Sequence, residues 1–402
     1  MPVFSITNKT INPRQLRKAL SYIDNYWDEL KISASRDQQT LIGLPNPYIV
    51  PSSEARQGFV YREMYYWDNY FIVEALLASG QRELARGIVD NMLAMIEKFG
   101  LVPNANRYYM LSRSQPPLLT SMILAVYAHA GDKRWFKRAM TLAKQEYHMV
   151  WMGNQQPHNR QAYKGLSRYY DINVLHELAE AESGWDYSPR FDNRCLDWLP
   201  VDLNSYLYKY EMDFSGAGLL PGADQDDSWA DLANTRAKRM RRLLWDKKSG
   251  LFLDYDYTNR RRAQTSSLAS YMPLFSGLAQ PQEAESARQA LKRFETKWGL
   301  SATSLDGGMH VGQQWALPNG WAPLHYLVIK GLQRYSYDDD ARRIAEKWLK
   351  LNLKTFIKTG RFYEKYNVVK GNHRAVPGVY PAQVGFGWTN AVFMVLAKEL
   401  YS

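Results

Sequence analysis

Four segments of the chain share one pattern: an apolar helix, a short polar or glycine-containing turn, and a second, amphipathic helix. The four segments are residues 71–96, 119–144, 266–294 and 322–350. In the second helix of the first segment, the apolar residues from Leu84 to Phe99 are spaced by four, four, four and three positions, the period of an α-helix. Each hairpin must bury its apolar face on a neighbour, so the repetition predicts an all-α, closed or stacked helical array. The periods vary, which favours a toroid of about six hairpins over a regular solenoid.

The chain is expected to form one domain. Its 402 residues, 46% of them apolar, can bury a large core, and length alone would suggest about two or three domains. No linker rich in Gly, Ser or Pro interrupts the chain, and its composition does not change along its length. We therefore expect residues 1–402 to form a single domain, with a first helix over residues 14–31 and a proline-fixed loop over residues 44–52.

The net charge of +11 raises the question of a nucleic-acid partner. The basic residues cluster at residues 236–248 and 260–262. The first cluster lies on a helical pattern in which Leu232, Met240 and the Leu243–Leu244 pair would face inward. A solvated helix face explains this pattern better than a groove that follows phosphates, and no nucleic-acid motif accompanies it. We expect no nucleic-acid partner.

Cysteine and histidine usage gives no sign of a disulfide, a metal or a cofactor. Cys195 is the one cysteine of the sequence, and the seven histidines never approach a metal-ligand spacing. The N-terminal stretch MPVFSITNKTINPRQLRKAL lacks the apolar segment of a signal peptide, and no run of about eighteen apolar residues occurs. These features predict a soluble, cytoplasmic protein without a membrane partner. The oligomeric state stays open.

Long, aromatic, glycine-containing segments separate the hairpins. They are residues 100–117, 150–172, 182–206, 300–323 and 359–390. In a helical toroid such loops would gather at one end, and loops of this length inside a compact domain are usually functional. The 13 Trp, 28 Tyr and 14 Phe of the sequence suit a sugar-binding cleft, although these residues also fill cores.

One of these segments carries a candidate general acid. The stretch Ala181 to Phe191 reads A-E-S-G-W-D-Y-S-P-R-F, and a helix-compatible run stops at Ser183-Gly184, where glycine can take the left-handed conformation. The carboxyl of Asp186 then follows Trp185 on a tight loop. Partial burial beside an indole would raise its pKa and keep it protonated at neutral pH, as a general acid requires. Taken alone, the motif also fits a structural role, with Asp186 capping a turn and Trp185 filling the core.

Five blocks of the sequence resemble the trehalase family, glycoside hydrolase family 37. They are YREMYYWDNYF (61–71), LVPNANRYYMLSRSQPP (101–117), ESGWDYSPRF (182–191) with VDLNSYL (201–207), QQWALPNGWAP (313–323), and EKYN (364–367) with GFGWTN (385–390). The blocks occur in the family's order and cover residues from about 60 to 390. Any one of them could arise by chance, but five collinear blocks identify the chain as a member.

The resemblance implies an (α/α)6 toroid and an inverting hydrolase of an α-glucoside, with α,α-trehalose as the type substrate. Asp186 falls at the family's general-acid position and Glu364 at its general-base position. An inverting enzyme needs a protonated carboxyl on the leaving oxygen and an ionised one about 6.5–9.5 Å away that activates water on the opposite face. The adjacent Lys365 favours the ionised form of Glu364. Without the surrounding blocks, Glu364 and Lys365 would be taken for a surface ion pair.

Further positions carry over one at a time as substrate-binding residues. They are Tyr61, Trp67, Asp68, Asn104, Arg113, Gln115, Arg168, Gly184, Trp185, Trp315, Gln383 and Trp388. Asn104 and Arg113 match positions that hold sugar hydroxyls. For Trp67 and Trp315, a core role is as compatible with the sequence as a sugar contact. Arg168 occupies the place of a family arginine only if the register of its segment is right.

Several departures from the family pattern put the substrate in doubt. Val60 stands in place of a substrate-binding arginine, Ala316 in place of a carboxylate in Q-Q-W-D, and Val379 in place of a glutamate in the lid. An arginine–glutamate segment before the general acid is missing, and the chain is shorter than typical members. Trehalose is the first expectation, and another small α-glucoside of the glucosylglycerol or glucosylglycerate type is the alternative. A catalytically silent sugar-binding relative is the third possibility, although such a protein has no need of both Asp186 and Glu364.

Overall fold

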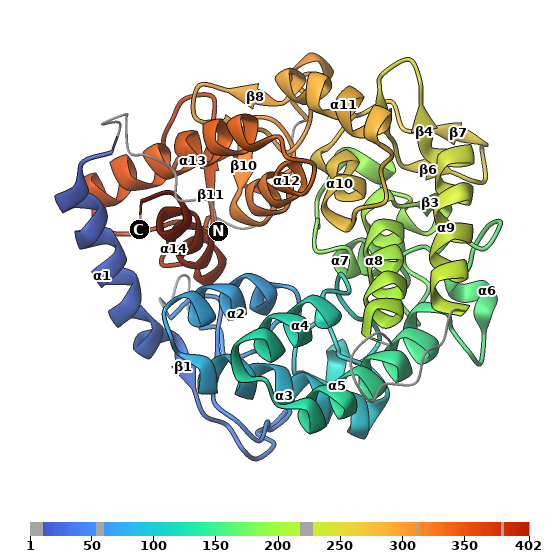
Figure 1. Cartoon of the computed structure of the whole chain (residues 1–402), viewed down its shortest axis with the longest axis horizontal. Coiled ribbons are helices and arrows are strands. Elements are labelled where there is room, and N and C mark those ends of the chain that lie inside the picture. The colour runs from blue at the N-terminus through green and yellow to red at the C-terminus, as the bar shows by residue number, and fades with distance from the viewer. Residues whose placement is uncertain (1–10, 54–59, 218–227, 311, 379–381, 402) are drawn as a thin grey trace.

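The computed structural model describes residues 11–53, 60–217, 228–310, 312–378 and 382–401. Six helices of this part form an inner ring. They are α2 (Asp68–Ala78), α4 (Leu119–Ala130), α8 (Val201–Ala217), α10 (Met272–Ser276), α12 (Ala322–Arg334) and α14 (Gly387–Tyr401). Each packs against the next, and α14 packs against α2, so the ring is closed (Figure 1).

Six further helices of the described residues form an outer layer. They are α1 (Pro13–Leu30), α3 (Arg82–Phe99), α5 (Lys133–Glu146), α9 (Ser228–Leu244), α11 (Pro281–Ala290) and α13 (Asp338–Thr359). The two layers differ in sequence because they differ in burial. Residues Gly387 to Ala397 of α14 are buried on every face, whereas α5 has one apolar stripe and one charged face. The expected (α/α)6 toroid is confirmed.

Three of the four hairpins expected from the sequence are observed as packed helix pairs, and the fourth is shortened. The pairs α2–α3, α4–α5 and α12–α13 lie where the pattern predicts them, and α1 lies within one residue of the expected first helix. The hairpin expected over residues 266–294 is reduced to a five-residue α10 and a ten-residue α11. Residues Leu268–Tyr271 form a 3-10 turn before α10, and Pro281 starts α11 only after an extended Gln280.

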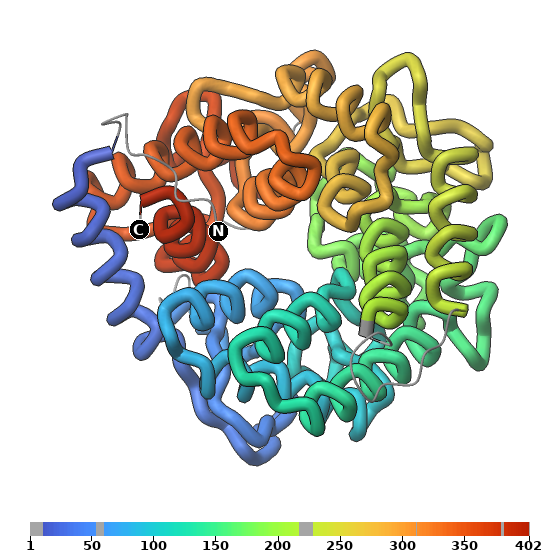
Figure 2. The backbone as a smooth tube through the Cα atoms, viewed as in Figure 1, coloured from blue at the N-terminus to red at the C-terminus, as the bar shows by residue number. Residues whose placement is uncertain are grey.

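Two pairings were not expected. Helices α8 and α9 form one hairpin. The other joins the two ends of the chain, since α1 packs against α14, which Figure 2 shows as the blue and dark-red helices lying side by side. No local pattern reveals this second pair, because its two helices are separated by the whole sequence.

The basic helix α9 is oriented differently from the expectation. Met240 and Leu244 are buried as predicted, but Leu232 is 44% exposed. Arg236 turns inward instead and forms an ion pair with Glu211, with a Nη2–Oε1 distance of 2.7 Å. The prediction that the basic residues of α9 face solvent therefore fails for Arg236. It holds for other basic residues of this helix, such as Arg239 and Arg242, which are exposed.

Short elements between the helices connect the loops. Two of these elements are short helices, α6 (Pro157–Arg160) and α7 (His176–Glu182). Four strand pairs form two-stranded sheets: β1 (Lys31–Ile32) with β2 (Tyr48–Ile49), β4 (Trp245–Asp246) with β5 (Leu251–Phe252), β8 (Glu295–Thr296) with β9 (Gly299–Leu300), and β10 (Asn319–Trp321) with β11 (Lys365–Asn367). A three-stranded sheet has the order β3 (Trp198–Leu199), β6 (Tyr255–Asp256) and β7 (Arg261–Arg262). All of these pairs are antiparallel. Within the described ranges, no helix combines the length and the apolar character needed to cross a membrane.

Candidate active site

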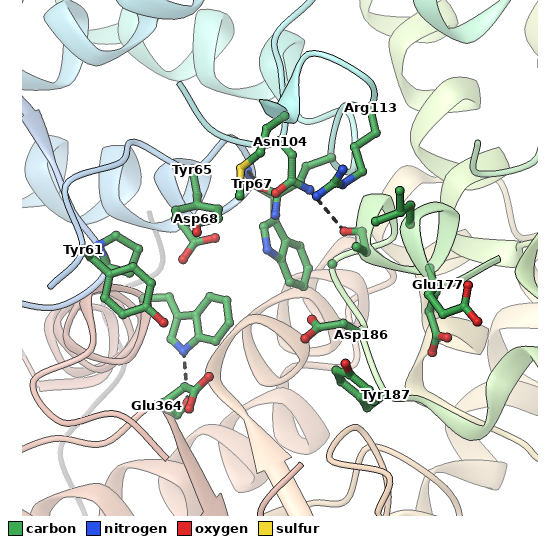
Figure 3. Close-up of a pocket in the computed structure, with 18 of the residues that line it drawn as sticks. Tyr61, Tyr65, Trp67, Asp68, Asn104, Arg113, Glu177, Asp186, Tyr187 and Glu364 are labelled. Carbon is green, nitrogen blue, oxygen red and sulfur yellow. Dashed lines mark hydrogen bonds between the residues drawn. The ribbon is translucent and has the colours of Figure 1, made fainter. Parts of the chain in front are cut away.

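A cavity of about 470 Å³ brings together residues from loops that are far apart in the sequence (Figure 3). Most of the residues expected at the site line it: Tyr61, Trp67, Asp68, Asn104, Arg113, Gln115, Gly184, Asp186, Glu364 and Trp388. No motif in the sequence marks the remaining lining residues, which are Pro51, Tyr65, Met110, Glu177, Leu178, Glu180, Ala181, Tyr187, Asn193 and Phe386. Several of these lie inside the quoted blocks or within two turns of Asp186.

Gly184 sets the position of Asp186. Helix α7 ends at Glu182, and Gly184 then has a φ of +73°, the left-handed conformation expected from the sequence. A Cβ atom at this position would lie 2.8 Å from Cε2 of Trp67. Glycine is therefore required both by the backbone angle and by the close approach of the indole, and the chain turns there to place Asp186 in the cavity wall.

The carboxyl of Asp186 has the character of a proton donor. Burial raises its pKa from the usual 3.8 to about 6, and the negative charge of Glu364 adds to this effect, while Lys365 opposes it. Trp185 is buried and stacks on Trp315, with ring centroids 5.2 Å apart, so neither of these two tryptophans is part of the cavity lining. Trp315 is therefore buried in the core, and its side chain also acts on the carboxyl of Asp186 by lowering its pKa.

Backbone hydrogen bonds fix Glu364 at the opposite wall. The Glu364 N–H donates to the Gln383 carbonyl at 2.9 Å, and the Gln383 N–H donates to Glu364 Oε2 at 3.1 Å. The indole Nε1 of Trp388 donates to the Glu364 carbonyl at 3.0 Å. Gln383 was expected in the cleft but does not line it. It holds Glu364 through its main chain instead.

A lysine and a glutamine link the two carboxylates. Pairing of β10 with β11 brings Lys365 next to the Q-Q-W segment, where its Nζ donates to Gln314 Oε1 at 2.6 Å. Gln314 Nε2 in turn donates to Asp186 Oδ2 at 3.1 Å. The same Lys365 Nζ lies 3.5 Å from Glu364 Oε2. Gln314 was not singled out, although it belongs to a quoted block, because nothing local marks which glutamine of Q-Q faces inward.

Other polar residues of the lining hold the loops to one another. Asn104 Nδ2 donates to the carbonyl of Ala181 at 3.2 Å, and the Trp67 N–H donates to Gln115 Oε1 at 3.1 Å. Arg113 forms an ion pair with the buried Asp171, with a distance of 3.2 Å. These contacts join the first two blocks of the sequence to the loop that carries Asp186.

Asp68 is a third carboxyl in the cavity. It lies in the first turn of α2 and is 4% exposed. Burial raises its pKa to about 8, and the charges of Glu364 and Asp186 act in the same direction. At neutral pH this carboxyl is therefore largely protonated and can donate a hydrogen bond as well as accept one.

The structure does not bring Arg168 to the cavity. Its guanidinium donates to the carbonyls of Asn159 and Leu196 and to the hydroxyl of Tyr257, each at 2.8–2.9 Å. With these contacts Arg168 holds the surrounding loops together. The expectation that it lies in the cleft is therefore wrong. Of the departures from the family pattern, Val60 is 47% exposed and Ala316 is fully buried, and neither lines the cavity. Val379 lies outside the described residues.

Comparisons with known proteins identify the family of the chain. The sequence model of the family described as trehalase matches residues 4–177 and 173–400. The periplasmic trehalase of Xanthomonas oryzae pv. oryzae is 32% identical over 428 residues, which cover 95% of this chain and 73% of that protein. The periplasmic trehalase of Xanthomonas campestris pv. campestris is 33% identical over 429 residues, with the same coverage.

Solved structures share the fold. The neutral trehalase of Saccharomyces cerevisiae superposes with a TM-score of 0.83 at 24% identity, covering 96% of this chain and 94% of that one. A GH63 mannosylglycerate hydrolase from Thermus thermophilus, solved in complex with glucose, gives a TM-score of 0.68 at 17% identity, covering 95% and 99%. The family match extends over nearly the whole chain, and the relatives exceed 30% identity across it. The chain belongs to the trehalase family of glycoside hydrolases.

Proposed function

We propose that this protein hydrolyses an α-glucoside with inversion, that its substrate is α,α-trehalose, and that Asp186 and Glu364 are the catalytic pair. The observation that carries the proposal is the pair itself. One carboxyl with its pKa raised to about 6 and a second one ion-paired to Lys365 line the same cavity. The names of the relatives, which are trehalases, support the substrate. Residues 1–402 act in this proposal as one catalytic domain.

In the proposed reaction, protonated Asp186 gives its proton to the glycosidic oxygen as the bond from that oxygen to the anomeric carbon breaks. Glu364 takes a proton from a water molecule, whose oxygen attacks the anomeric carbon from the opposite face. The glucose that is attacked leaves as the β-anomer, and the glucose that departs keeps its α configuration. Gln314 and Lys365 hold both carboxyl groups in place during these steps.

Glucose release from trehalose tests the proposal. We expect release by the unaltered protein and at least about 10³-fold slower release by Asp186→Asn and Glu364→Gln, because each loses one proton transfer. Proton NMR at early times should detect α- and β-glucose in equal amounts. Full activity of either variant, or a product that is α-glucose alone, would overturn the assignment.

A second candidate is another small α-glucoside, of the glucosylglycerol or glucosylglycerate type. Its support is that Val60 is exposed and Ala316 is buried, so neither supplies the polar contact expected at its position. Turnover of such a substrate without turnover of trehalose would favour it. Binding of sugars without any turnover would instead indicate a silent relative.

The remaining expectations on partners and location stay predictions. A small sugar is the proposed ligand, no nucleic acid is expected, and the oligomeric state is open. The cytoplasmic location expected from the sequence contrasts with the relatives quoted above, which are named periplasmic. Fractionation of cells that express the protein tests it.

A further inference from the structure

The cavity continues beyond Asp186, on the side away from Glu364. In Figure 3, Asp186 lies between Glu364 on one side and Glu177 on the other, with Tyr187 beside it. A general acid stands next to the oxygen that joins the two halves of its substrate. The glucosyl unit that is attacked therefore occupies the half of the cavity near Glu364, and the leaving group occupies the half formed by Glu177, Glu180, Tyr187 and Asn193.

Glu180 is the buried polar group of this second half. It lies on α7 and is 8% exposed, and its Oε1 accepts a hydrogen bond from the Ser188 N–H at 2.8 Å. Among the described residues, no donor bonds its Oε2 and no basic side chain lies within ion-pair distance of it, although the more distant charge of Arg190 acts on it. Burial raises its pKa to about 7. An oxygen of a carboxyl on the cavity wall can accept a hydrogen bond from a hydroxyl of a bound ligand.

The charges of the cavity wall point to the kind of ligand. The carboxyl groups that line it are Glu177 and Glu180 in the leaving-group half, and Asp68, Asp186 and Glu364 in the rest of the cavity, where Asp68 and Asp186 are protonated in the proposed reaction. Arg113 is the cation that the described lining offers, and its charge is already paired with Asp171. A carboxylate or phosphate on the leaving group would thus enter an acidic pocket without a counter-ion, whereas hydroxyl groups can donate to these oxygens.

We propose that Glu180 determines the leaving group: it accepts a hydrogen bond from a hydroxyl of an uncharged polyhydroxy leaving group, and with the neighbouring carboxyls it excludes leaving groups that carry a carboxylate or a phosphate. The inference rests on the proposed hydrolase function, and it separates two substrates that the sequence left open. Glucosylglycerol and trehalose fit the pocket, and glucosylglycerate does not. Glu180 is a specificity residue here, since it touches the leaving group and takes no part in the proton transfers.

The test compares kcat/KM for α-glucosylglycerol and α-glucosylglycerate, whose leaving groups differ in one carboxylate. We expect the unaltered protein to prefer glucosylglycerol by at least about tenfold, because the anionic group is buried without a partner. In Glu180→Gln this preference should shrink about tenfold, mainly through KM. The matched control is Glu29→Gln, which removes the same charge from an exposed position on α1 outside the cavity lining, and which should leave the ratio unchanged.

α-Glucosyl fluoride serves as a reference substrate because its leaving group has no hydroxyl. The loss of kcat/KM in Glu180→Gln should be about tenfold larger for trehalose than for the fluoride, which also reports whether the variant is folded. If a protein that hydrolyses trehalose had equal kcat/KM for α-glucosylglycerol and α-glucosylglycerate, this inference would be overturned and the proposed function would stay intact. A protein that hydrolyses none of these substrates, the fluoride included, would overturn the proposed function itself.

Discussion

At the scale of single residues, the two proposed catalytic carboxyls differ in their surroundings. Asp186 is partly buried, receives a hydrogen bond from the neutral amide of Gln314, and has a raised pKa. Glu364 is held by main-chain contacts and lies beside the ammonium group of Lys365. Two chemically similar groups can therefore take different roles, because burial raises the pKa of Asp186 and favours it as the proton donor.

The pH dependence of activity follows from the raised pKa of Asp186. The general acid must be protonated, so kcat/KM should fall as the pH rises through its pKa, which is about 6 in the free protein. We expect the alkaline limb of the kcat/KM profile near this value, with a tenfold loss for each further pH unit. Initial rates of glucose release between pH 4 and 9 measure it. A limb near pH 8 would instead point to Asp68 as the proton donor.

Lys365 should act as a positioning residue. In Lys365→Met, Gln314 loses its donor and Asp186 loses the orientation that Gln314 provides, so kcat should fall by about 10²-fold. The alkaline limb should also move to higher pH, because the lysine charge lowers the pKa of Asp186 and its removal lets the proton stay bound. A purely structural role would change the rate without moving the limb. Lys370→Met is the control, since Lys370 is exposed just after the same strand.

The sequence could predict residues whose role is marked by a motif, and it missed residues whose role depends on a contact between distant segments. Asp186 can be predicted from the helix end at Gly184 and from the sequence blocks of the trehalase family around it. Glu180 lies on the same short helix, but nothing in its local sequence shows which face of α7 the cavity occupies. Gln314 becomes important only through pairing of β10 with β11, which no local pattern predicts.

At the scale of elements, buried polar side chains fix how the helices and loops meet. Glu146, the last residue of α5, accepts hydrogen bonds at Oε2 from the hydroxyls of Tyr66 and Tyr210 at 3.3 and 3.0 Å. Tyr210 also accepts from the Leu119 N–H at the start of α4. One carboxyl thus joins an outer helix to two inner ones. Its Oε1 is buried, and no donor among the described residues bonds it.

Removing the charge of Glu146 should stabilise the protein at alkaline pH. Burial raises its pKa from 4.5 to about 8, so the folded state binds this proton more tightly than the unfolded state does. Stability from this group is complete below pH 4.5 and is lost as the pH rises towards 8. Relative to the unaltered protein, Glu146→Gln should gain about 1–3 kcal/mol in its free energy of unfolding when the pH is raised from 5 to 8.5.

Urea unfolding at the two pH values measures this effect. Glu97→Gln is the control, because Glu97 carries the same charge on the exposed face of α3, where it pairs with Arg138. A stability difference between Glu146→Gln and the unaltered protein that is equal at both pH values would contradict the assigned burial of the charge.

The elements themselves could be predicted where the apolar period is long. Helices α3, α5 and α13 run for at least fourteen residues with one apolar face, and the sequence located all three. The five-residue α10 is too short for its period to be read, and the 3-10 turn before it keeps the same apolar composition. Arg236 joins the buried face of α9, in place of the expected Leu232, because its partner Glu211 lies on another helix.

At the scale of the whole molecule, the ring is closed by its last helix. Helix α14 lies between α12 and α2 and packs against both, while α1 covers it from outside. The repeated hairpins predict a ring of this kind because every unit needs a neighbour on each side. The partner of each end could not be predicted, since closure joins residues at opposite ends of the sequence.

The closure of the ring by α14 has a consequence for how the protein folds during its synthesis on the ribosome. Domains assemble as they are synthesised, from the N-terminal end onward, and exposed apolar surface on an incomplete chain invites aggregation. The nascent chain must carry the uncovered faces of α2 and α12 until residues 387–401 leave the exit tunnel. Trp388, which lines the cavity and bonds the carbonyl of Glu364, arrives in that same final helix. The cleft is therefore complete only after residues 387–401 have been synthesised and have joined the ring.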